Sequence, residues 1–138
     1  MSRCRVVLDT NVLVSALLSP TGNPAKIYRM VLTGVLDLVV AADIIEEYRD
    51  VLARPRLGIP AQDSATVLTV IHHHAQHINP RPSTGPMPDE DDRIFYDTAK
   101  SASAYLVTGN TKHYPSEPII VTPTEFLRLP DRTAADVI

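Results

Sequence analysis

Short, nearly continuous apolar runs alternate along the chain with stretches whose apolar residues recur at helical spacing. Residues 5–8, 35–40 and 104–107 form three such runs, rich in branched aliphatic side chains, and each predicts a buried strand. A fourth run at residues 119–121 predicts a last short strand. Strands that are apolar almost throughout are typical of a parallel sheet covered on both faces.

Helices are predicted between these runs. Helical spacing indicates helices over residues 12–18 and roughly 61–78, and a third that follows the acidic stretch 89–92 and reaches Ala102. Residues 79–88 contain four prolines, which predicts a loop between the last two of these helices.

Three more helices are predicted from capping residues. They begin at Asn23, Asp43 and Thr122, and the first two end at Gly34 and Pro55. Glu46 and Glu125 follow Asp43 and Thr122 at the spacing of a capping box, in which two side chains satisfy the free amides of the first turn.

The alternation of strands and helices predicts an α/β protein in three layers. A central, mainly parallel sheet of four to five strands is expected to carry helices on both faces. The 138 residues are enough to build one hydrophobic core, so a single domain over residues 1–138 is expected, with residues 130–138 as a loosely held tail.

Composition narrows the function further. The chain is 44% hydrophobic and 21% charged, as folded globular domains are, and no apolar run approaches the roughly 18 residues of a membrane helix. Cys4 is the single cysteine and no secretion leader opens the chain, so a cytoplasmic protein without a membrane span is expected. The formal net charge of −3 argues against a protein that coats nucleic acids, but it is compatible with a nuclease built on clustered acids.

Polar residues gather where ligands bind in a parallel α/β sheet, at the carboxyl ends of the strands near the point where strand order reverses. Asp9 directly follows the first strand, residues 89–92 lead into the helix before the third, and Asn110 lies just past the third. Several acids at one edge would raise one another's pKa values, and a divalent cation, Mg²⁺ or Mn²⁺, is the simplest compensation.

Glu47 is the fourth candidate. It is expected on the edge of the apolar stripe of its helix, three residues after Ile44 and four before Val51, where it can point inward. Glu46 is expected to cap the helix and to face away from the stripe.

Each candidate also has a purely structural interpretation. Asp9 could form a turn with Thr10 and Asn11. At least two of the acids at residues 89–92 are expected to serve only the helix dipole, and Glu47 could be a solvated helix residue. The placement of these acids at one edge of the sheet favours a functional cluster.

Four histidines look at first like a metal signature, and His73 and His77 have the spacing of a helical zinc pair. No third ligand is spaced nearby, so all four are expected to be surface residues: His72, His73, His74 and His77. The sequence has no glycine-rich phosphate loop, and no serine or cysteine nucleophile with an identifiable base.

Several segments resemble the PIN-domain family over nearly the whole chain. They are Val7-Leu8-Asp9-Thr10-Asn11-Val12, residues 46–55, residues 89–95, Tyr105-Leu106-Val107-Thr108-Gly109-Asn110 and residues 121–127. The chain is most similar to the bacterial subgroup of toxins from toxin–antitoxin pairs, relatives of the VapC-like ribonucleases.

The resemblance implies a metal-dependent endoribonuclease with Mg²⁺ or Mn²⁺ at its acids. Asp9, Glu47 and Asp92 match the first three family acids, with Asp89 close by, and Asn110 stands where the family usually has aspartate. This departure leaves one fewer charge and puts a full two-metal site in doubt. Supporting or substrate-contacting roles are expected for Asn11, Thr108, Arg93, Lys112 and His113.

By the same resemblance the expected partners are an RNA substrate, an antitoxin protein and a second copy of the chain in a homodimer. Two alternatives remain open. Asn110 favours a PIN module that has lost activity and acts through protein or RNA binding. A phosphatase or phosphoryl-transfer domain could use Asp9 as a nucleophile, although the second acid that such enzymes often need is replaced here by Asn11.

Overall fold

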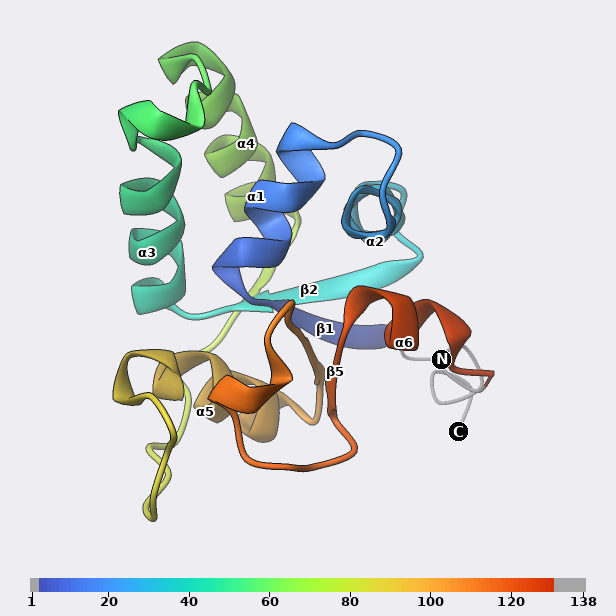
Figure 1. Ribbon diagram of the computed structural model, residues 1–138, viewed down its shortest axis with the longest axis vertical. Helices are drawn as coiled ribbons and strands as arrows, with labels where there is room; N and C mark the ends of the chain where they lie inside the picture. The colour runs from blue at the N-terminus through green and yellow to red at the C-terminus, as the bar shows by residue number, and fades with distance from the viewer. Residues whose placement is uncertain (1–2, 131–138) are drawn as a thin grey trace.

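A parallel sheet of five strands runs through the middle of the molecule (Figure 1), and the computed structural model describes residues 3–130. The strands are β1 (Cys4–Leu8), β2 (Leu36–Val40), β3 (Gln76–His77), β4 (Tyr105–Val107) and β5 (Ile120–Val121). They lie side by side in the order β3-β2-β1-β4-β5, and every pair is parallel. Strand order therefore reverses between β1 and β4.

Helices cover both faces of this sheet. They are α1 (Thr10–Leu18), α2 (Asn23–Leu32), α3 (Ala42–Leu52), α4 (Ala61–His74), α5 (Arg93–Ala102) and α6 (Pro123–Arg128). Figure 1 shows α1 to α4 on one side of β1 and β2, and α5 on the other. Helix α5 contacts β1, β2 and β4, whereas α2 contacts β2 and α1 contacts α2 and α3. The three-layer α/β prediction is confirmed.

The core explains why the strands are apolar almost throughout. Both β1 and β2 are buried at four of five positions, because helices lie over each face. The half-buried positions are Arg5 and Asp37, which face each other in the register of the two strands. Arg5 donates a hydrogen bond to the Ala102 carbonyl, and Asp37 pairs with Arg3 at 3.2 Å. The polar exceptions therefore have partners at the opposite edge of the sheet from Asp9.

A sheet of four to five strands was expected, but no strand was predicted at the position of β3. The spacing indicated one helix over residues 61–78, but α4 ends at His74, and β3 (Gln76–His77) pairs with the end of β2. Ala75 has extended backbone angles, and the Ile78 amide donates to the Val40 carbonyl at 2.9 Å. Two exposed residues at a sheet edge show no apolar period, so the pattern could not distinguish this strand from a further helical turn.

Two of the predicted helix starts are shifted. The residue before α3 is Ala41, with no side-chain cap, so Asp43 lies within the first turn and the capping box with Glu46 does not form. Asn23 is the first residue of α2, and its side-chain amide donates to Thr124 on α6 instead of capping its own helix. At neither helix does the side chain reach back to the first free amides.

The other capping predictions agree with the structure. Thr122 and Glu125 form a complete capping box, with hydrogen bonds of 2.8 and 3.1 Å, and a proline opens α6. Gly34 follows the end of α2 with a φ of +81°, a conformation that favours glycine. The tail predicted at residues 130–138 lies from residue 131 onward outside the described residues.

The longest helix of the described chain, α4, has 14 residues. Among residues 3–130, no helix combines the length and the apolar character needed to cross a bilayer.

Candidate active site

The reversal of strand order places two polar residues next to each other. Asp9 follows β1 directly, and its amide donates to the Val107 carbonyl of β4 at 2.9 Å. Thr108 follows β4 directly, and its amide donates to the Val121 carbonyl of β5 at 2.9 Å. Sheet hydrogen bonds thus continue one residue beyond both strands and hold these two backbones in place.

The Asp9 carboxylate is buried and oriented by two hydroxyl groups. Only 6% of the residue is exposed, and its Oδ2 accepts hydrogen bonds from Thr108 Oγ1 at 2.8 Å and from the Tyr114 hydroxyl at 2.9 Å. Among the described residues, no hydrogen bond reaches Oδ1. One oxygen of Asp9 is therefore fixed and the other is available to a ligand.

Glu47 and Glu46 separate as their helix positions predicted. Glu47 is half-buried and its Oε2 accepts a hydrogen bond from Thr10 Oγ1, whereas Glu46 is exposed. The next residue, Tyr48, is fully buried, and its hydroxyl group donates a hydrogen bond to the Leu8 carbonyl at 2.5 Å. These two contacts attach α3 to the end of β1 and bring Glu47 beside Asp9.

The third group of polar side chains comes from the start of α5 and the loop after β4. Asp92 Oδ2 lies 3.2 Å from His113 Nδ1, and His113 Nε2 lies 2.9 Å from the side-chain nitrogen of Asn110. Asp89 accepts a hydrogen bond from the Asp91 amide and lies on the same side. The possible ligand atoms of Asp89, Asp92 and His113 all lie within 4.8 Å of one another.

Electrostatics link these groups into one cluster. Burial, as the largest cause, and the negative charges of Asp9, Asp89 and Glu47 together raise the pKa of the Asp92 carboxyl to about 6, while His113 acts in the opposite direction. Four carboxylates therefore lie close enough to repel one another, and one neighbouring imidazole opposes their negative charge. A divalent cation would offset this repulsion, and carboxylate oxygens are the ligands that Mg²⁺ and Mn²⁺ prefer.

Tyr114 is protected against ionisation. Burial raises the pKa of its hydroxyl far above the usual range, and the charges of Asp9 and Asp92 and the hydrogen bond to Asp9 raise it further. Burial, followed by the charges of Asp9 and Glu47, also raises the pKa of the Tyr48 hydroxyl. Tyr114 therefore keeps its hydroxyl proton and remains a hydrogen-bond donor to Asp9 at any pH at which the protein would act.

The loop after β4 is fixed against α1. Asn11 Oδ1 accepts a hydrogen bond from the Gly109 amide at 3.1 Å, and the Asn110 amide donates to Thr108 Oγ1 at 3.0 Å. A Cβ atom at Gly109 would lie 3.4 Å from Asn11 Oδ1, so the two segments approach closely. Asn11 and Thr108 thus position the loop that carries Asn110.

Arg93 has a different role from the one expected of it. Its three guanidinium nitrogens donate within the protein, to Glu90 at 2.7 Å, to the carbonyl and hydroxyl of Ser83, and to the Gly85 carbonyl at 2.6 Å. These bonds anchor the proline-rich loop to the start of α5. A guanidinium that is committed in this way offers no free donor to a phosphate, so the substrate contact expected for Arg93 is not supported.

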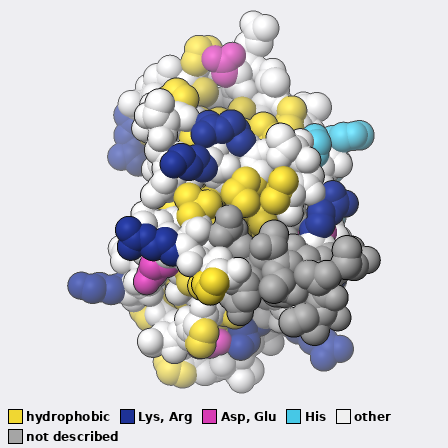
Figure 2. All heavy atoms as spheres, turned by 90° about the vertical axis from the view of Figure 1, so that its right-hand side faces the viewer, with side chains coloured by type: hydrophobic (Ala, Val, Ile, Leu, Met, Phe, Trp, Pro, Cys, Tyr) yellow, Lys and Arg dark blue, Asp and Glu magenta, His cyan; other side chains and the backbone are white. Residues whose placement is uncertain are grey.

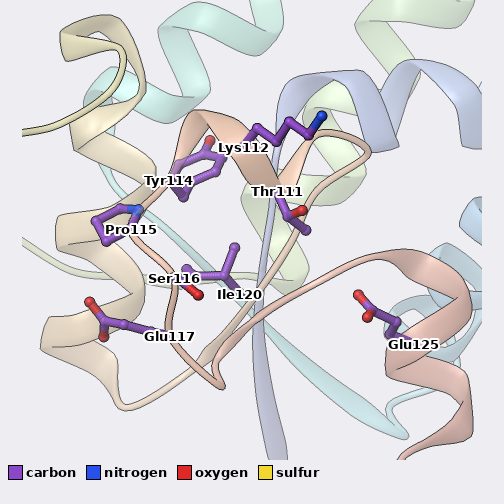
Figure 3. A pocket seen from close by; sticks show the side chains of 8 residues that line it. All are labelled: Thr111, Lys112, Tyr114, Pro115, Ser116, Glu117, Ile120 and Glu125. Carbon is purple, nitrogen blue, oxygen red and sulfur yellow. The ribbon is translucent and has the colours of Figure 1, made fainter.

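Lys112 and His113 lie on the loop that carries Tyr114. Both side chains are exposed, and Figure 3 shows the Lys112 ammonium group and the Tyr114 hydroxyl directed toward the same side of the loop. The pocket drawn there has a volume of about 290 Å³ and is lined by Lys112 and Tyr114, but by none of the four clustered acids. The histidines at positions 72, 73, 74 and 77 are all exposed, as expected.

Sequence reasoning missed three hydroxyl groups that organise the site: those of Thr10, Tyr48 and Tyr114. Thr10 follows Asp9 directly, so its neighbourhood could have suggested a role. Tyr114 lies more than a hundred residues from Asp9, in a loop without periodicity, and no spacing signals the contact. Sequence reasoning also missed that a ring nitrogen of His113 lies close to the carboxylate oxygens of Asp89 and Asp92. Asp9 and Glu47 do not belong to that close group.

Acidic side chains that can hold a metal, set at the point where strand order reverses in a parallel sheet, define an α/β protein with a metal-competent acidic centre. Residues 5–112 match the family model described as PIN domain. The chain belongs to the PIN-domain family, whose members are generally nucleases, and this assigns it to the hydrolases.

The chain is also similar to an uncharacterized protein of Methanocaldococcus jannaschii, MJ1680. The two are 28% identical over 111 residues, which cover 78% of this chain and 72% of the archaeal protein. No solved structure matches the chain significantly.

Replacing Asp92 by asparagine should stabilise the metal-free protein near neutral pH but not near pH 4. The ordinary aspartate pKa is 3.8 and that of folded Asp92 is about 6, so the folded state binds this proton more tightly than the unfolded state. The contribution of Asp92 to the stability of the wild type must therefore fall as the pH rises between these two values. Asparagine has no carboxyl group to ionise, so Asp92→Asn does not lose this stability as the pH rises. Thermal unfolding in a chelator across this range measures the difference.

The exposed neighbour Asp91 supplies the matched control for that experiment. Asp91→Asn should leave the pH dependence of the wild type intact. Addition of Mn²⁺ should reverse the order of wild type and Asp92→Asn, because an ion that binds the folded state raises its melting temperature. The same pH dependence in wild type and Asp92→Asn would contradict the crowding of carboxylates.

Replacing Tyr114 by phenylalanine should weaken binding of Mn²⁺ about tenfold. The variant keeps the ring in the core but removes the hydrogen bond that orients Asp9, and partners of metal ligands typically contribute a factor of roughly 10 to 100 in affinity. Calorimetric titration with Mn²⁺ measures the change. Tyr28→Phe on α2 is the control, and equal affinities in all three proteins would show that Mn²⁺ binding does not depend on the hydrogen bond from Tyr114 to Asp9.

Proposed function

We propose that this PIN domain is a metal-dependent endoribonuclease that hydrolyses RNA phosphodiester bonds with Mg²⁺ or Mn²⁺. The observation that supports the proposal best is the gathering of three further carboxylates around the half-buried Asp92, whose ligand atom lies within 4.8 Å of those of Asp89 and His113. Such a cluster is costly in a folded protein unless it serves to bind a cation. PIN nucleases act on RNA, which gives the substrate class.

Asp9, Asp92 and Glu47 are the proposed metal ligands, and each is held by a partner. Asp9 is oriented by Thr108 and Tyr114, Glu47 by Thr10, and Asp92 by His113. A bound divalent ion would lower the pKa of a water molecule and stabilise charge on the phosphate oxygens. Two hydrogen bonds fix Oδ2 of Asp9, and Oδ1, which accepts none from the described residues, is the proposed ligand oxygen.

Asn110 stands where the family usually has aspartate, and we assign it a supporting role. Its side-chain nitrogen contacts His113, so the amide holds the imidazole close to Asp92. The neutral amide leaves one fewer negative charge for metal binding. Lys112 is the proposed contact for the RNA backbone, because the donors of Arg93 and both ring nitrogens of His113 already have partners within the protein.

Wild-type protein should cleave RNA when Mn²⁺ is added, and Asp9→Asn should be slower by about a hundredfold or more. The metal-supported stabilisation of a phosphoryl transition state amounts to several kcal/mol, and each 1.36 kcal/mol corresponds to about a factor of ten in rate. Gel analysis of a labelled RNA measures the cleavage. Asp50→Asn, an exposed acid on α3, should retain the wild-type rate.

Equal residual cleavage by wild type and Asp9→Asn would defeat the nuclease proposal and favour a PIN module that only binds. Rapid turnover of a phosphate monoester, with a phosphorylated Asp9 trapped, would instead favour the phosphatase alternative. Both outcomes can be tested with the same purified proteins. The RNA cleavage assay tests the first, and a separate assay of phosphate-monoester turnover tests the second.

We further propose that the nuclease is the toxin of a cytoplasmic toxin–antitoxin pair and acts as a homodimer. Figure 2 shows the side on which α2 and α6 lie, where hydrophobic side chains gather between basic ones. Large exposed hydrophobic residues of the described chain include Leu32 and Val35 at the end of α2, and Leu18 at the end of α1. Apolar surface of this kind is what a partner would cover.

Expression of the wild-type chain should arrest bacterial growth, and expression of Asp9→Asn should not. Co-expression of the small protein encoded beside it should restore growth and block RNA cleavage by the purified chain. Growth curves with matched protein levels make the comparison. Normal growth with active wild-type nuclease present would remove the toxin role but leave the nuclease proposal intact.

A further inference from the structure

A second pocket lies one strand away from the acids, and no step of the proposed hydrolysis uses it. It has a volume of about 420 Å³, within the range of roughly 300–1,000 Å³ of small-molecule sites. Its walls are largely apolar, with Ile78 and Pro80 on one side and Ile94 of α5 on another. Apolar walls of this kind suit the face of a nucleobase.

An unpartnered carboxylate lines this pocket. Asp97 on α5 is only 6% exposed, and its Oδ1 is the one buried side-chain oxygen or nitrogen of the described residues without a hydrogen-bond partner. A buried carboxylate that accepts no hydrogen bond is unfavourable, because it has lost water and gained nothing in exchange. A ligand with hydrogen-bond donors would satisfy it.

The pocket also offers hydrogen-bond donors. Ala42 and Asp43 line it and are the first residues of α3, which has 11 residues and no side-chain cap. The first amides of a helix have no partner within it, and no hydrogen bond between described residues reaches these two. The start of α3 therefore favours an acceptor, and the helix dipole favours partial negative charge there.

The register of the sheet relates this pocket to the proposed catalytic acids. Val6 of β1 pairs with Leu38 of β2, so Asp9 lies opposite Ala41, the residue before α3. Neighbouring strands are about 4.8 Å apart. Asp97 follows Asp92 by five residues, about 7.5 Å along the axis of α5. Both separations are on the scale of one nucleotide.

We propose that this pocket binds the guanine base of a nucleotide next to the scissile phosphate. Guanine presents two neighbouring donors, N1–H and the 2-amino group, which match the two oxygens of the Asp97 carboxylate. Its O6 is an acceptor for the free amides of Ala42 and Asp43. The proposal rests on the proposed RNA hydrolysis for its biological meaning, but base binding itself requires neither metal nor cleavage.

Other occupants fit the same groups less well. Adenine and cytosine each offer a single donor group beside a ring acceptor, and uracil has one donor between two acceptors, so none provides two adjacent donors to a carboxylate. An arginine side chain from a protein partner has five donors but no acceptor, and it would leave the amides of α3 without a partner. It would also bring positive charge to the positive end of the helix dipole.

Equilibrium binding of the four nucleoside monophosphates to the full chain, in a chelator, tests the proposal. GMP should bind roughly ten- to a hundredfold more tightly than AMP, CMP or UMP, the discrimination typical of a bidentate base contact. Asp97→Asn should abolish this preference and favour xanthosine monophosphate, because xanthine has a carbonyl acceptor where guanine has its amino group. Asp50→Asn is the charge-matched control and should retain the preference for GMP.

Ala42→Pro tests the other half of the pocket without depending on the folding of the Asp97 variant. Proline is well tolerated at the first position of a helix, and the extended Ala41 before it is compatible with proline. The variant removes one amide donor and should weaken GMP binding severalfold while leaving Asp97 in place. Equal affinity for all four nucleotides, unchanged GMP binding in both variants, or tighter binding of an arginine amide than of GMP would overturn the proposal.

Mapping the cut sites on an RNA that contains all four bases separates this inference from the proposed function. Cleavage next to guanines that spreads to other bases in Asp97→Asn supports both. Cleavage without base preference would overturn the guanine pocket and leave the nuclease. GMP binding that depends on Asp97, in a protein that cuts no RNA, would overturn the nuclease and leave the pocket.

Discussion

The structure depends on the pairing of β1 with β4, because this contact between distant parts of the chain sets Asp9 beside Thr108. The hydrogen bond from Thr108 Oγ1 to Asp9 Oδ2 joins residues 99 positions apart. A buried carboxylate at the end of a strand requires such donors, since it has lost its water. Tyr114 supplies the second donor, and Tyr48 ties α3 to the same strand end. The reversal of strand order thus creates the place for the acids and also the groups that keep them there.

Stability and chemistry are in opposition at this edge. Asp9, Glu47, Asp89 and Asp92 repel one another, and a protein selected only for stability would replace some of them. The rest of the molecule offsets the repulsion with a core in which β1, β2 and β4 are covered on both faces. His113 reduces it locally. The acids are therefore understandable as a cation site, because a cation that binds the folded state would offset the stability lost to their repulsion.

Features set by local chemistry could be predicted from the sequence, and features set by distant contacts could not. The apolar strands and the capping box of Thr122 with Glu125 follow from neighbouring residues, and both appear in the structure. The position of Glu47 followed from helical spacing. By contrast, β3 exists only because β2 offers its edge, and its two residues have no pattern of their own. Arg93 was expected to contact phosphate because it lies close in sequence to the acidic edge, but Ser83, Gly85 and Glu90 already use its donors. The contact of Tyr114 with Asp9 required the folded chain.

At Asn110 the backbone maintains the turn, and the side chain determines the charge at this position of the site. Its backbone amide holds the turn after β4, whereas its side chain contacts only the exposed His113 among the described residues. A different side chain at this position would leave the turn intact. Natural selection can therefore adjust the electrical character of the site here, by a single codon change, without rebuilding the scaffold that supports it.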